Sequence, residues 1–283
     1  MPHPIHDTVY VSDLDGTLLG PDGRLSPGSR AAIEQLLERG VQFTVASARS
    51  VISMRGALGD LALRLPVVCF NGGFVSDLST LRHIEVFDLG EDARAAWTMA
   101  KDLGLVPMVS TTDGVSEDRV FIPHQRNPGV EWYVNDRQRA QDPRLRLVDE
   151  PGEAIDQRVT CLTVIDRRER LEPYAAALAS TFGDRLRPHL FDDLYTVGWS
   201  WLTVHAGQAT KARAVRSVLE AAGLADRRLV AFGDQENDLP LLDAADHAVA
   251  TANAAEAVKA VADEVIGHHQ DDAVVKWMLE AVG

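Results

Sequence analysis

Short apolar runs alternate with amphipathic segments along the first part of the chain. Residues 8–11, 41–46 and 66–70 are apolar and predict three strands. Helices are predicted at 27–39, after a capping serine and with proline in the first turn, and at 50–59. Strands and helices that alternate at this spacing indicate βαβ units, whose strands form a parallel sheet.

The pattern changes beyond residue 90. A helix is predicted at 91–103, and a polar stretch rich in Pro, Gly and Asp follows from about 107 to 152. A strand at 158–165, a helix at 167–182 and strands at 185–191 and 195–205 complete this region. We expect it to form a separate α+β unit.

The βα alternation then returns and continues to the C-terminus. Helices are predicted at 211–222, 239–244, 254–262 and 272–279, with strands at 228–232 and 247–250. The chain is therefore expected to hold an α/β, Rossmann-like core with a parallel sheet, formed by residues 1–84 and 192–283. Residues 85–191 are the expected inserted α+β domain.

Charge and composition exclude several classes of protein. The chain has 283 residues and a formal net charge of -14 at pH 7, which argues against nucleic-acid binding and against adhesion to an anionic membrane. No apolar run is long enough to span a membrane, and the N-terminus lacks the features of a signal peptide, so the cytoplasm is the expected location. Cys69 and Cys161 lie in apolar runs and are interpreted as small buried hydrophobic residues.

Asp13 and Asp15 stand two residues apart, where the first apolar run meets a glycine. In an extended segment, residues i and i+2 point the same way, so both carboxylates would project from one strand end. Adjacent carboxylates repel each other unless a cation lies between them or one of them holds a proton. The pair therefore suits a metal-assisted nucleophile and an acid. The alternative is an ordinary Asp-rich turn.

Three further segments place polar groups at predicted strand ends or helix starts. Ser47 follows the second strand, Lys211 begins a helix, and Gly-Asp-Gln-Glu-Asn-Asp at 233–238 follows a later strand. Ligands of open α/β sheets bind at the carboxyl ends of the strands, and helix N-termini favour anions. Taken singly, these are also typical of a turn, a solvated lysine and a helix cap. Their joint occurrence favours a phosphate site, and lysine is a rare cation in this chain, at four of 28 basic residues.

The chain resembles the haloacid dehalogenase superfamily of phosphohydrolases. Asp-Leu-Asp-Gly-Thr-Leu at 13–18, a strand-end serine, an isolated lysine and Gly-Asp-x-x-Asn-Asp occur in that family's order. The inserted unit lies between the second and third of these motifs, as in the type II (C2) cap subgroup. Phe-Asn-Gly-Gly at 70–73 and the segment 252–259 are similar to the Cof-type, or IIB, branch.

The resemblance implies roles for the residues of these motifs. Asp13 would attack phosphorus to give an aspartyl phosphate, and Asp15 would protonate the leaving alcohol and then activate water. Ser47 and Lys211 would hold the transferring phosphoryl group.

Mg²⁺ is the implied cofactor, because an anion that attacks an anion needs a counter-charge. The implied protein ligands are Asp13, the backbone carbonyl of Asp15 and Asp234. Asp238, also implied as a metal residue, and Asn237 would support the metal or the phosphate from nearby. Substrate contacts are implied for Arg49, Asn71, Gly72 and Asn237.

The sequence therefore predicts a Mg²⁺-dependent phosphomonoester hydrolase that acts on small phosphorylated metabolites, sugar phosphates foremost. A phosphosugar mutase or a dedicated glycosyl-phosphate phosphatase is one alternative, and a phosphoryl-ligand sensor without turnover is another. The expected form is a monomer or small homo-oligomer without nucleic-acid or membrane partners. Thr251, Ala209-Thr210 and residues 268–272 depart from the branch pattern, and these departures are expected to concern substrate identity.

Overall fold

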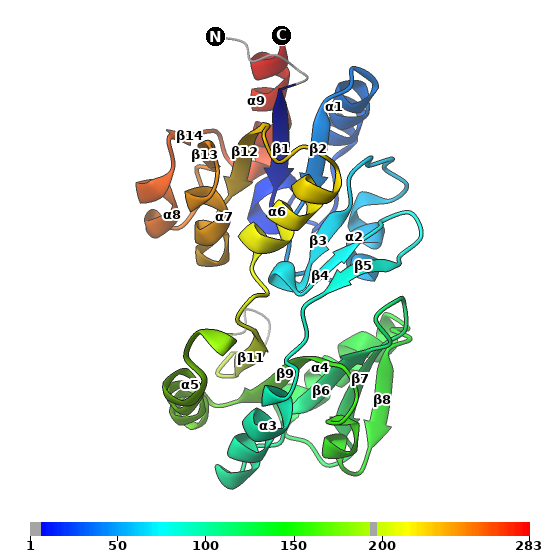
Figure 1. Ribbon diagram of the computed structural model, residues 1–283, viewed down its shortest axis with the longest axis vertical. Helices are drawn as coiled ribbons and strands as arrows, with labels where there is room; N and C mark the ends of the chain where they lie inside the picture. Colours follow the sequence, from blue (N-terminus) through cyan, green and yellow to red (C-terminus); the bar gives the residue numbers. More distant parts are fainter. Residues whose placement is uncertain (1–6, 193–196) are drawn as a thin grey trace. The chain divides into compact units, whose positions relative to one another are not determined.

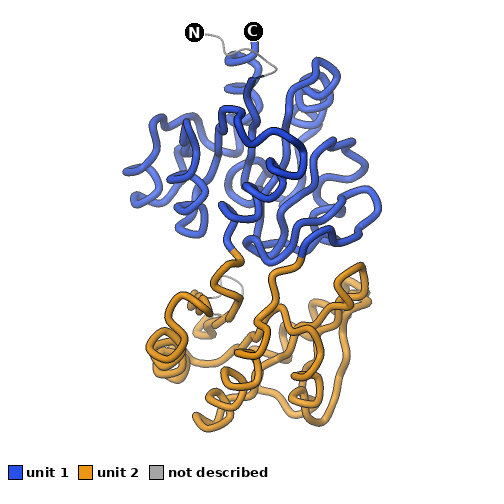
Figure 2. Tube along the Cα trace, viewed as in Figure 1, with its two compact units in different colours: residues 1–85, 210–283 blue, residues 86–209 orange. Residues whose placement is uncertain are grey.

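The structure is a computed structural model that describes residues 7–192 and 197–283. The chain forms two compact units, unit 1 (Met1–Glu85 and Thr210–Gly283) and unit 2 (Val86–Ala209), coloured separately in Figure 2. The insertion therefore begins within one residue of the expected position but returns to unit 1 at 210 rather than 192. The expected boundary is wrong because the strand Ser200–Ala206 pairs along its length with Leu186–Asp192 and belongs to the sheet of unit 2. The first two residues of the strand predicted at 195–205 lie outside the described residues.

Unit 1 is built on a parallel sheet of five strands in the order β14-β13-β12-β1-β2 (Figure 1). The central strand β1 is buried at every position, as its apolar run predicts for a strand covered on both faces. The strands are β1 (Thr8–Ser12), β2 (Gln42–Val45), β12 (Arg228–Gly233), β13 (His247–Ala250) and β14 (Glu264–Val265).

Helices cover both faces of this sheet. The chain moves from β1 to β2 through α1, and in the opposite direction from β12 to β13 through α7. Because such crossovers are right-handed, α1 and α7 lie on opposite faces. α1 packs against α9, and α7 packs against α6 and α8. The helices are α1 (Pro27–Glu38), α2 (Val51–Leu58), α6 (Lys211–Ala221), α7 (Leu239–Asp243), α8 (Glu256–Val261) and α9 (Ala273–Val282).

A smaller sheet continues the order of strands beyond β2. It contains β3 (Val67–Cys69), β4 (Phe74–Ser76) and β5 (His83–Val86). A parallel bridge between Ala46 and Val68 joins the end of β2 to β3. The carboxyl ends of β12, β1, β2 and β3 therefore lie in a row, and the chain reverses its direction of travel between β1 and β12. This is the switch point at which open α/β sheets bind ligands.

Unit 2 contains a six-stranded sheet in the order β10-β11-β9-β6-β7-β8. Its pairings are antiparallel except for β7 with β8. The stretch 107–152, expected only as a polar segment, holds three of these strands and a helix. The elements are α3 (Asp92–Asp102), β6 (Met108–Thr112), β7 (Asp118–Pro123), α4 (Pro128–Arg139), β8 (Leu145–Val148), β9 (Val159–Asp166), α5 (Arg168–Phe182), β10 (Leu186–Asp192) and β11 (Ser200–Ala206).

Alternation along the strands gives unit 2 a core on each face of its sheet. Leu162 and Val164 of β9 pack with residues of α3 and α5, whereas Ile165 packs with Val130 and Val134 of α4. Side chains of a strand point alternately to opposite faces, so a single strand supplies both cores. This explains why β9 is buried at all eight positions.

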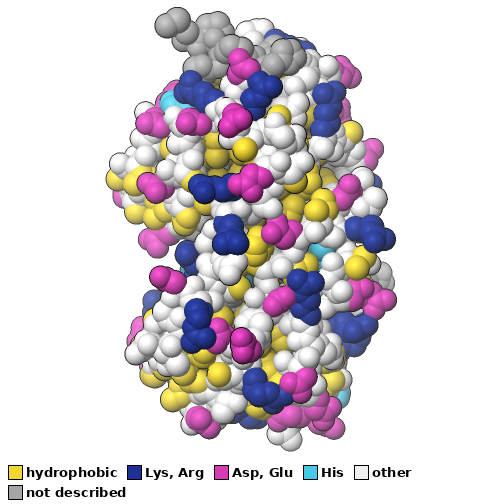
Figure 3. All heavy atoms as spheres, viewed as in Figure 1, with side chains coloured by type: hydrophobic (Ala, Val, Ile, Leu, Met, Phe, Trp, Pro, Cys, Tyr) yellow, Lys and Arg dark blue, Asp and Glu magenta, His cyan; other side chains and the backbone are white. Residues whose placement is uncertain are grey.

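The surface carries charges of both signs. On the face drawn in Figure 3, acidic and basic side chains are interspersed, and no basic patch stands out among them. Among the described residues, no helix combines the length and the apolar character that a membrane span requires.

His205 of β11 makes the stability of unit 2 sensitive to acid. The side chain is buried beside Cys161, with 3.6 Å between Nε2 and Sγ, and burial lowers the pKa of His205 to about 4. Burial also raises the pKa of Cys161 to about 11. The histidine is therefore held neutral and the cysteine is held as a thiol.

We expect unit 2 to lose stability as the pH falls below 6.5. In the unfolded chain His205 takes up a proton near pH 6.5, whereas in the folded chain it stays neutral until about pH 4. Between pH 7.5 and pH 5 this difference lowers the free energy of unfolding by about 2 kcal/mol. Urea unfolding followed by tryptophan fluorescence measures the change, since four of the five tryptophans lie in unit 2. His205→Gln should remove most of this pH dependence, and an unchanged slope in that variant would contradict the assignment.

Candidate active site

The candidate residues gather at the row of carboxyl strand ends in unit 1. Asp13 directly follows β1, Asp234 directly follows β12, and Ser47 lies two residues beyond β2. Lys211 is the first residue of α6, and the hydroxyl of Thr210 caps that helix by accepting a hydrogen bond from the amide of Arg213. Every candidate site residue predicted from the sequence lies in unit 1.

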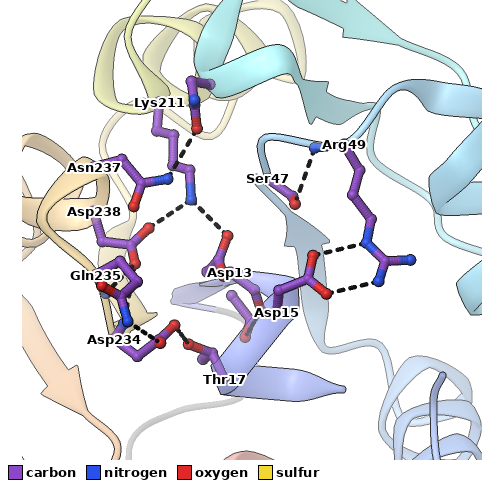
Figure 4. A network of polar contacts seen from close by, with 12 residues as sticks. Asp13, Asp15, Thr17, Ser47, Arg49, Lys211, Asp234, Gln235, Asn237 and Asp238 are labelled. Atoms are coloured by element: carbon purple, nitrogen blue, oxygen red, sulfur yellow. Dashed lines mark hydrogen bonds and ion pairs between the residues drawn. The ribbon is translucent and has the colours of Figure 1, made fainter. Parts of the chain in front are cut away.

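The turn after Asp13 is shaped by Gly16 and Thr17. Gly16 has a φ of 79°, and a Cβ at this position would collide with the carboxylate of Asp234. The hydroxyl of Thr17 donates a hydrogen bond of 2.7 Å to Oδ1 of Asp234. The glycine and threonine of the first motif thus bring the turn against the carboxylate that follows β12 (Figure 4).

Two residues that the sequence reasoning did not assign to the site hold the same turn from its other side. Thr251 Oγ1 and Asn253 Nδ2 both donate hydrogen bonds to the carbonyl oxygen of Gly16, at 3.3 and 2.8 Å. Asn253 belongs to the segment that carried the resemblance to the Cof-type branch, which was the available signal. The hydrogen bonds fix the backbone that follows the proposed nucleophile.

Lys211 connects two of the carboxylates. Its Nζ lies 2.5 Å from Oδ1 of Asp13 and 2.6 Å from Oδ1 of Asp238, and all three side chains are buried. Although burial works against the charge, the two carboxylates raise the pKa of Lys211 above its usual range. The lysine therefore remains an ammonium group.

Asp234 adds a third buried carboxylate to this group. One oxygen from each of Asp13, Asp234 and Asp238 lies within 4.8 Å of the others, the one such group found among the described residues. Burial raises the pKa of Asp13, with Asp238 and Asp234 adding to the effect and Lys211 opposing it. Burial also raises the pKa of Asp234. The excess of negative charge and the all-oxygen donor set fit a hard divalent cation.

The hydrogen bonds of Asp238 distinguish it within this group. Its Oδ1 faces Lys211, and its Oδ2 accepts hydrogen bonds from the backbone amides of Asp234 and Gln235 at 3.0 and 3.1 Å. Both oxygens are thus engaged by the protein. This arrangement favours a role for Asp238 in holding Lys211 and the loop that carries Asp234.

Asp15 lies apart from the carboxylate group. Its two oxygens accept hydrogen bonds from Nε and an Nη of Arg49, at 2.7 and 2.6 Å. Ser47 is buried, lies between Lys211 and Arg49 in Figure 4, and accepts a hydrogen bond of 3.3 Å from the amide of Arg49 on Oγ. The two aspartates of the first motif therefore have different cationic partners, Lys211 for Asp13 and Arg49 for Asp15.

The loop after β3 brings Asn71 to the same edge. Phe70, Asn71 and Gly72 all have positive φ, at 49°, 55° and 101°. A Cβ on Gly72 would collide with the backbone of Thr210, so this glycine permits the close approach of the loop to the start of α6. Asn237 Nδ2 donates a hydrogen bond of 2.9 Å to Oδ1 of Asn71. The loops that follow β3 and β12 are thus linked through two of the predicted substrate residues.

Removal of the Lys211 charge should destabilise unit 1. Lys211→Met leaves Asp13 and Asp238 buried without their cation, and we expect a loss of about 3 kcal/mol in the free energy of unfolding in the presence of a chelator. Lys259→Met is the matched control, because Lys259 pairs with Glu256 on the exposed surface of α8 and should change stability by less than about 1 kcal/mol. Urea unfolding followed by circular dichroism compares the two variants. Equal losses of unfolding free energy in the two variants would show that the buried ion pairs of Lys211 contribute no more to stability than an exposed one.

Known proteins resemble this chain along nearly its whole length. A family model described as haloacid dehalogenase-like hydrolase matches residues 10–278. The chain is 28% identical over 285 residues to the pyridoxal phosphate phosphatase YbhA of Escherichia coli, covering 95% of this chain and 97% of that protein. It is 24% identical to the 5-amino-6-(5-phospho-D-ribitylamino)uracil phosphatase YitU of Bacillus subtilis, with 96% of each covered.

Solved structures also resemble this protein in fold. A crystal structure of TM0651 from Thermotoga maritima matches with a TM-score of 0.76 and 25% sequence identity, covering 97% of each chain. A further structure from Eubacterium rectale matches with a TM-score of 0.77 at 20% identity, covering 98% of this chain and 99% of that one, and shows the fold alone. The resemblance stated from the motifs and the match over residues 10–278 agree: the chain belongs to the haloacid dehalogenase-like hydrolases.

Proposed function

We propose that this hydrolase is a Mg²⁺-dependent phosphatase, which cleaves the monoesters of small phosphorylated metabolites through an aspartyl phosphate on Asp13. The observation that carries the proposal is the contact of the Lys211 ammonium with Asp13, within a group of three buried carboxylates at the carboxyl ends of β1 and β12. A nucleophile, a fixed positive charge and a cation site are the elements that phosphoryl transfer requires.

Asp13 and Asp234 would hold Mg²⁺, together with the backbone carbonyl of Asp15, which the sequence predicts as a ligand. When bound, the ion supplies positive charge that offsets the repulsion between the carboxylate nucleophile and the phosphate. Asp238 has both oxygens engaged and would position Lys211 and Asp234.

In the first half-reaction, an oxygen of Asp13 forms a bond to phosphorus as the bond from phosphorus to the ester oxygen breaks. Asp15 gives its proton to that ester oxygen, which leaves as an alcohol. Lys211 and the hydroxyl of Ser47 stabilise the charge on the transferring oxygens. The product on the enzyme is a mixed anhydride of Asp13 and phosphate.

The second half-reaction regenerates the enzyme. Asp15, now a carboxylate, takes a proton from water as the water oxygen attacks phosphorus, and the bond between phosphorus and Asp13 breaks. Inorganic phosphate leaves, and Asp15 again carries the proton that it needs for the next substrate.

For the substrate, we propose sugar phosphates and other small phosphomonoesters. The relatives named above are a pyridoxal phosphate phosphatase and a phosphatase of a phosphoribitylamino-uracil, so both of these compounds belong in the substrate screen.

We further assign unit 2 as the cap domain that the resemblance implies, because it is inserted between the segment that carries Ser47 and the helix that begins with Lys211.

The test is a screen for phosphate release with Mg²⁺, using 4-nitrophenyl phosphate, sugar phosphates, pyridoxal phosphate and nucleotides. We expect turnover that a chelator abolishes. Asp13→Asn should reduce it to background, whereas Asp226→Asn, at an exposed position of the same unit, should leave it unchanged. Release of phosphate by the Asp13 variant at the wild-type rate, or no hydrolysis of any compound by the wild type, would refute the proposal.

Mg²⁺ should also stabilise the protein in the absence of substrate. At a concentration ten times its dissociation constant, a ligand that binds only the folded state adds about 1.4 kcal/mol. Asp234→Asn removes a proposed ligand and should abolish most of the rise in unfolding temperature that Mg²⁺ produces. The Asp226→Asn control should retain the full rise, and an undiminished rise in the Asp234 variant would place the ion elsewhere.

A further inference from the structure

The guanidinium group of Arg49 holds Asp15 with a two-pronged contact. Nε lies 2.7 Å from Oδ2 of Asp15, and an Nη lies 2.6 Å from Oδ1 (Figure 4). The Asp15 side chain is 54% exposed and that of Arg49 is 22% exposed. An ion pair this accessible to water contributes little to stability. Its geometry is informative nevertheless, because a bidentate contact fixes the plane of a carboxylate where a lysine would fix only its distance.

The backbone of Arg49 is anchored at both sides. Its amide donates to Oγ of Ser47 at 3.3 Å, and its carbonyl accepts from the amide of Phe70 at 3.0 Å. α2 begins two residues later, capped by Ser50, whose Oγ accepts from the amide of Ser53. The arginine therefore extends from a fixed point that is shared with Ser47.

The loop before α1 leaves room for the guanidinium group. Gly23 has a φ of 70°, and a Cβ at this position would lie 2.9 Å from an Nη of Arg49. The turn that contains Gly23 is closed by a hydrogen bond from its amide to the carbonyl of Gly20. A residue with a side chain here would press on the same nitrogen that binds Asp15.

We propose that Arg49 is a positioning residue, which orients the Asp15 carboxyl for proton transfer. The two-pronged contact belongs to the carboxylate that activates water, and the oxygen that carries the proton in the first half-reaction leaves its contact with Arg49. The inference rests on the proposed function and replaces the substrate contact that the sequence suggested for Arg49. Lys211 and the other two aspartates form a separate network around Asp13. The orientation of Asp15 is therefore set by Arg49 rather than by the groups that surround the nucleophile.

This role predicts a dependence on the leaving group. An alkoxide needs a proton as it departs, so alkyl phosphates depend on Asp15 in the first half-reaction. A nitrophenolate departs without a proton, so 4-nitrophenyl phosphate depends on Asp15 only in the second half-reaction, when water attacks the aspartyl phosphate. If Arg49 instead bound the phosphoryl group, its loss would slow the first half-reaction equally for both substrates and lower kcat/KM for both.

The experiment compares Arg49→Gln, Arg49→Lys and wild type on 4-nitrophenyl phosphate and on the best alkyl phosphate of the screen. For Arg49→Gln we expect kcat/KM to fall about 100-fold on the alkyl phosphate. On the aryl phosphate we expect kcat/KM to stay at the wild-type value while kcat and KM fall together. Acid quenching should then trap phosphate on the protein. Arg49→Lys keeps the charge but loses the two-pronged contact, and its kcat/KM on the alkyl phosphate should be intermediate.

Arg55→Gln is the matched control. Arg55 lies on α2 and donates to the carbonyl of Leu78, so its loss removes the same charge nearby and should leave both substrates unaffected. Equal losses of kcat/KM on both substrates in the Arg49 variants would overturn the proposal in favour of a phosphate contact, and unchanged kinetics would reduce the pair to a surface contact. If Arg49→Gln does not fold, Arg49→Lys makes the same distinction. A wild-type protein without turnover or trapped phosphate would instead refute the proposed function.

Discussion

The buried ammonium of Lys211, between Asp13 and Asp238, is the interaction on which the rest of the site depends. A charge removed from water is costly unless it is paired, and here one lysine pairs with two carboxylates from the segments that follow β1 and β12. Lys211 begins α6, the first helix after the chain returns to unit 1 at residue 210. The pair therefore fixes where the second segment of unit 1 joins the first. The same contact leaves a net negative charge at the switch point of the sheet, which a divalent cation can balance.

The environments of Asp13 and Asp15 separate two chemically identical groups into two roles. Asp13 is buried and faces an ammonium, whereas Asp15 is half-exposed and faces a guanidinium. In the proposed reaction, burial keeps Asp13, the nucleophile, away from water and close to the proposed cation site. In the same proposal, exposure gives Asp15 access to the leaving oxygen and to the attacking water. The spacing of two residues brings both side chains to one strand end, and their different cationic partners direct them apart.

The local features of the fold could be predicted from the sequence. Ser26 caps α1 as expected, with its Oγ accepting from the amide of Ser29, and β1 and β12 lie where their apolar runs placed them. Elements that depend on distant pairing could not. β6 contains Thr111 and Thr112, which are polar and yet buried, and this strand lies between β7 and β9, the latter some fifty residues later. The two-pronged contact between Arg49 and Asp15 likewise joins residues 34 positions apart. Neither an arginine nor an aspartate in the sequence indicates which partner it will contact.

Two of the three departures from the family pattern make hydrogen bonds around the turn after Asp13. Thr251 lies where the branch commonly has glycine, and its hydroxyl donates to the Gly16 carbonyl together with Asn253. His269, in the other divergent segment, contacts the carbonyl of Leu19 through Nδ1 at 2.8 Å, and its amide donates to Oδ1 of Asn253. These two departures thus take part in the hydrogen bonds around the turn after Asp13. They bear on how firmly the proposed nucleophile is placed, because each hydrogen bond to the Gly16 carbonyl restrains the turn that follows Asp13.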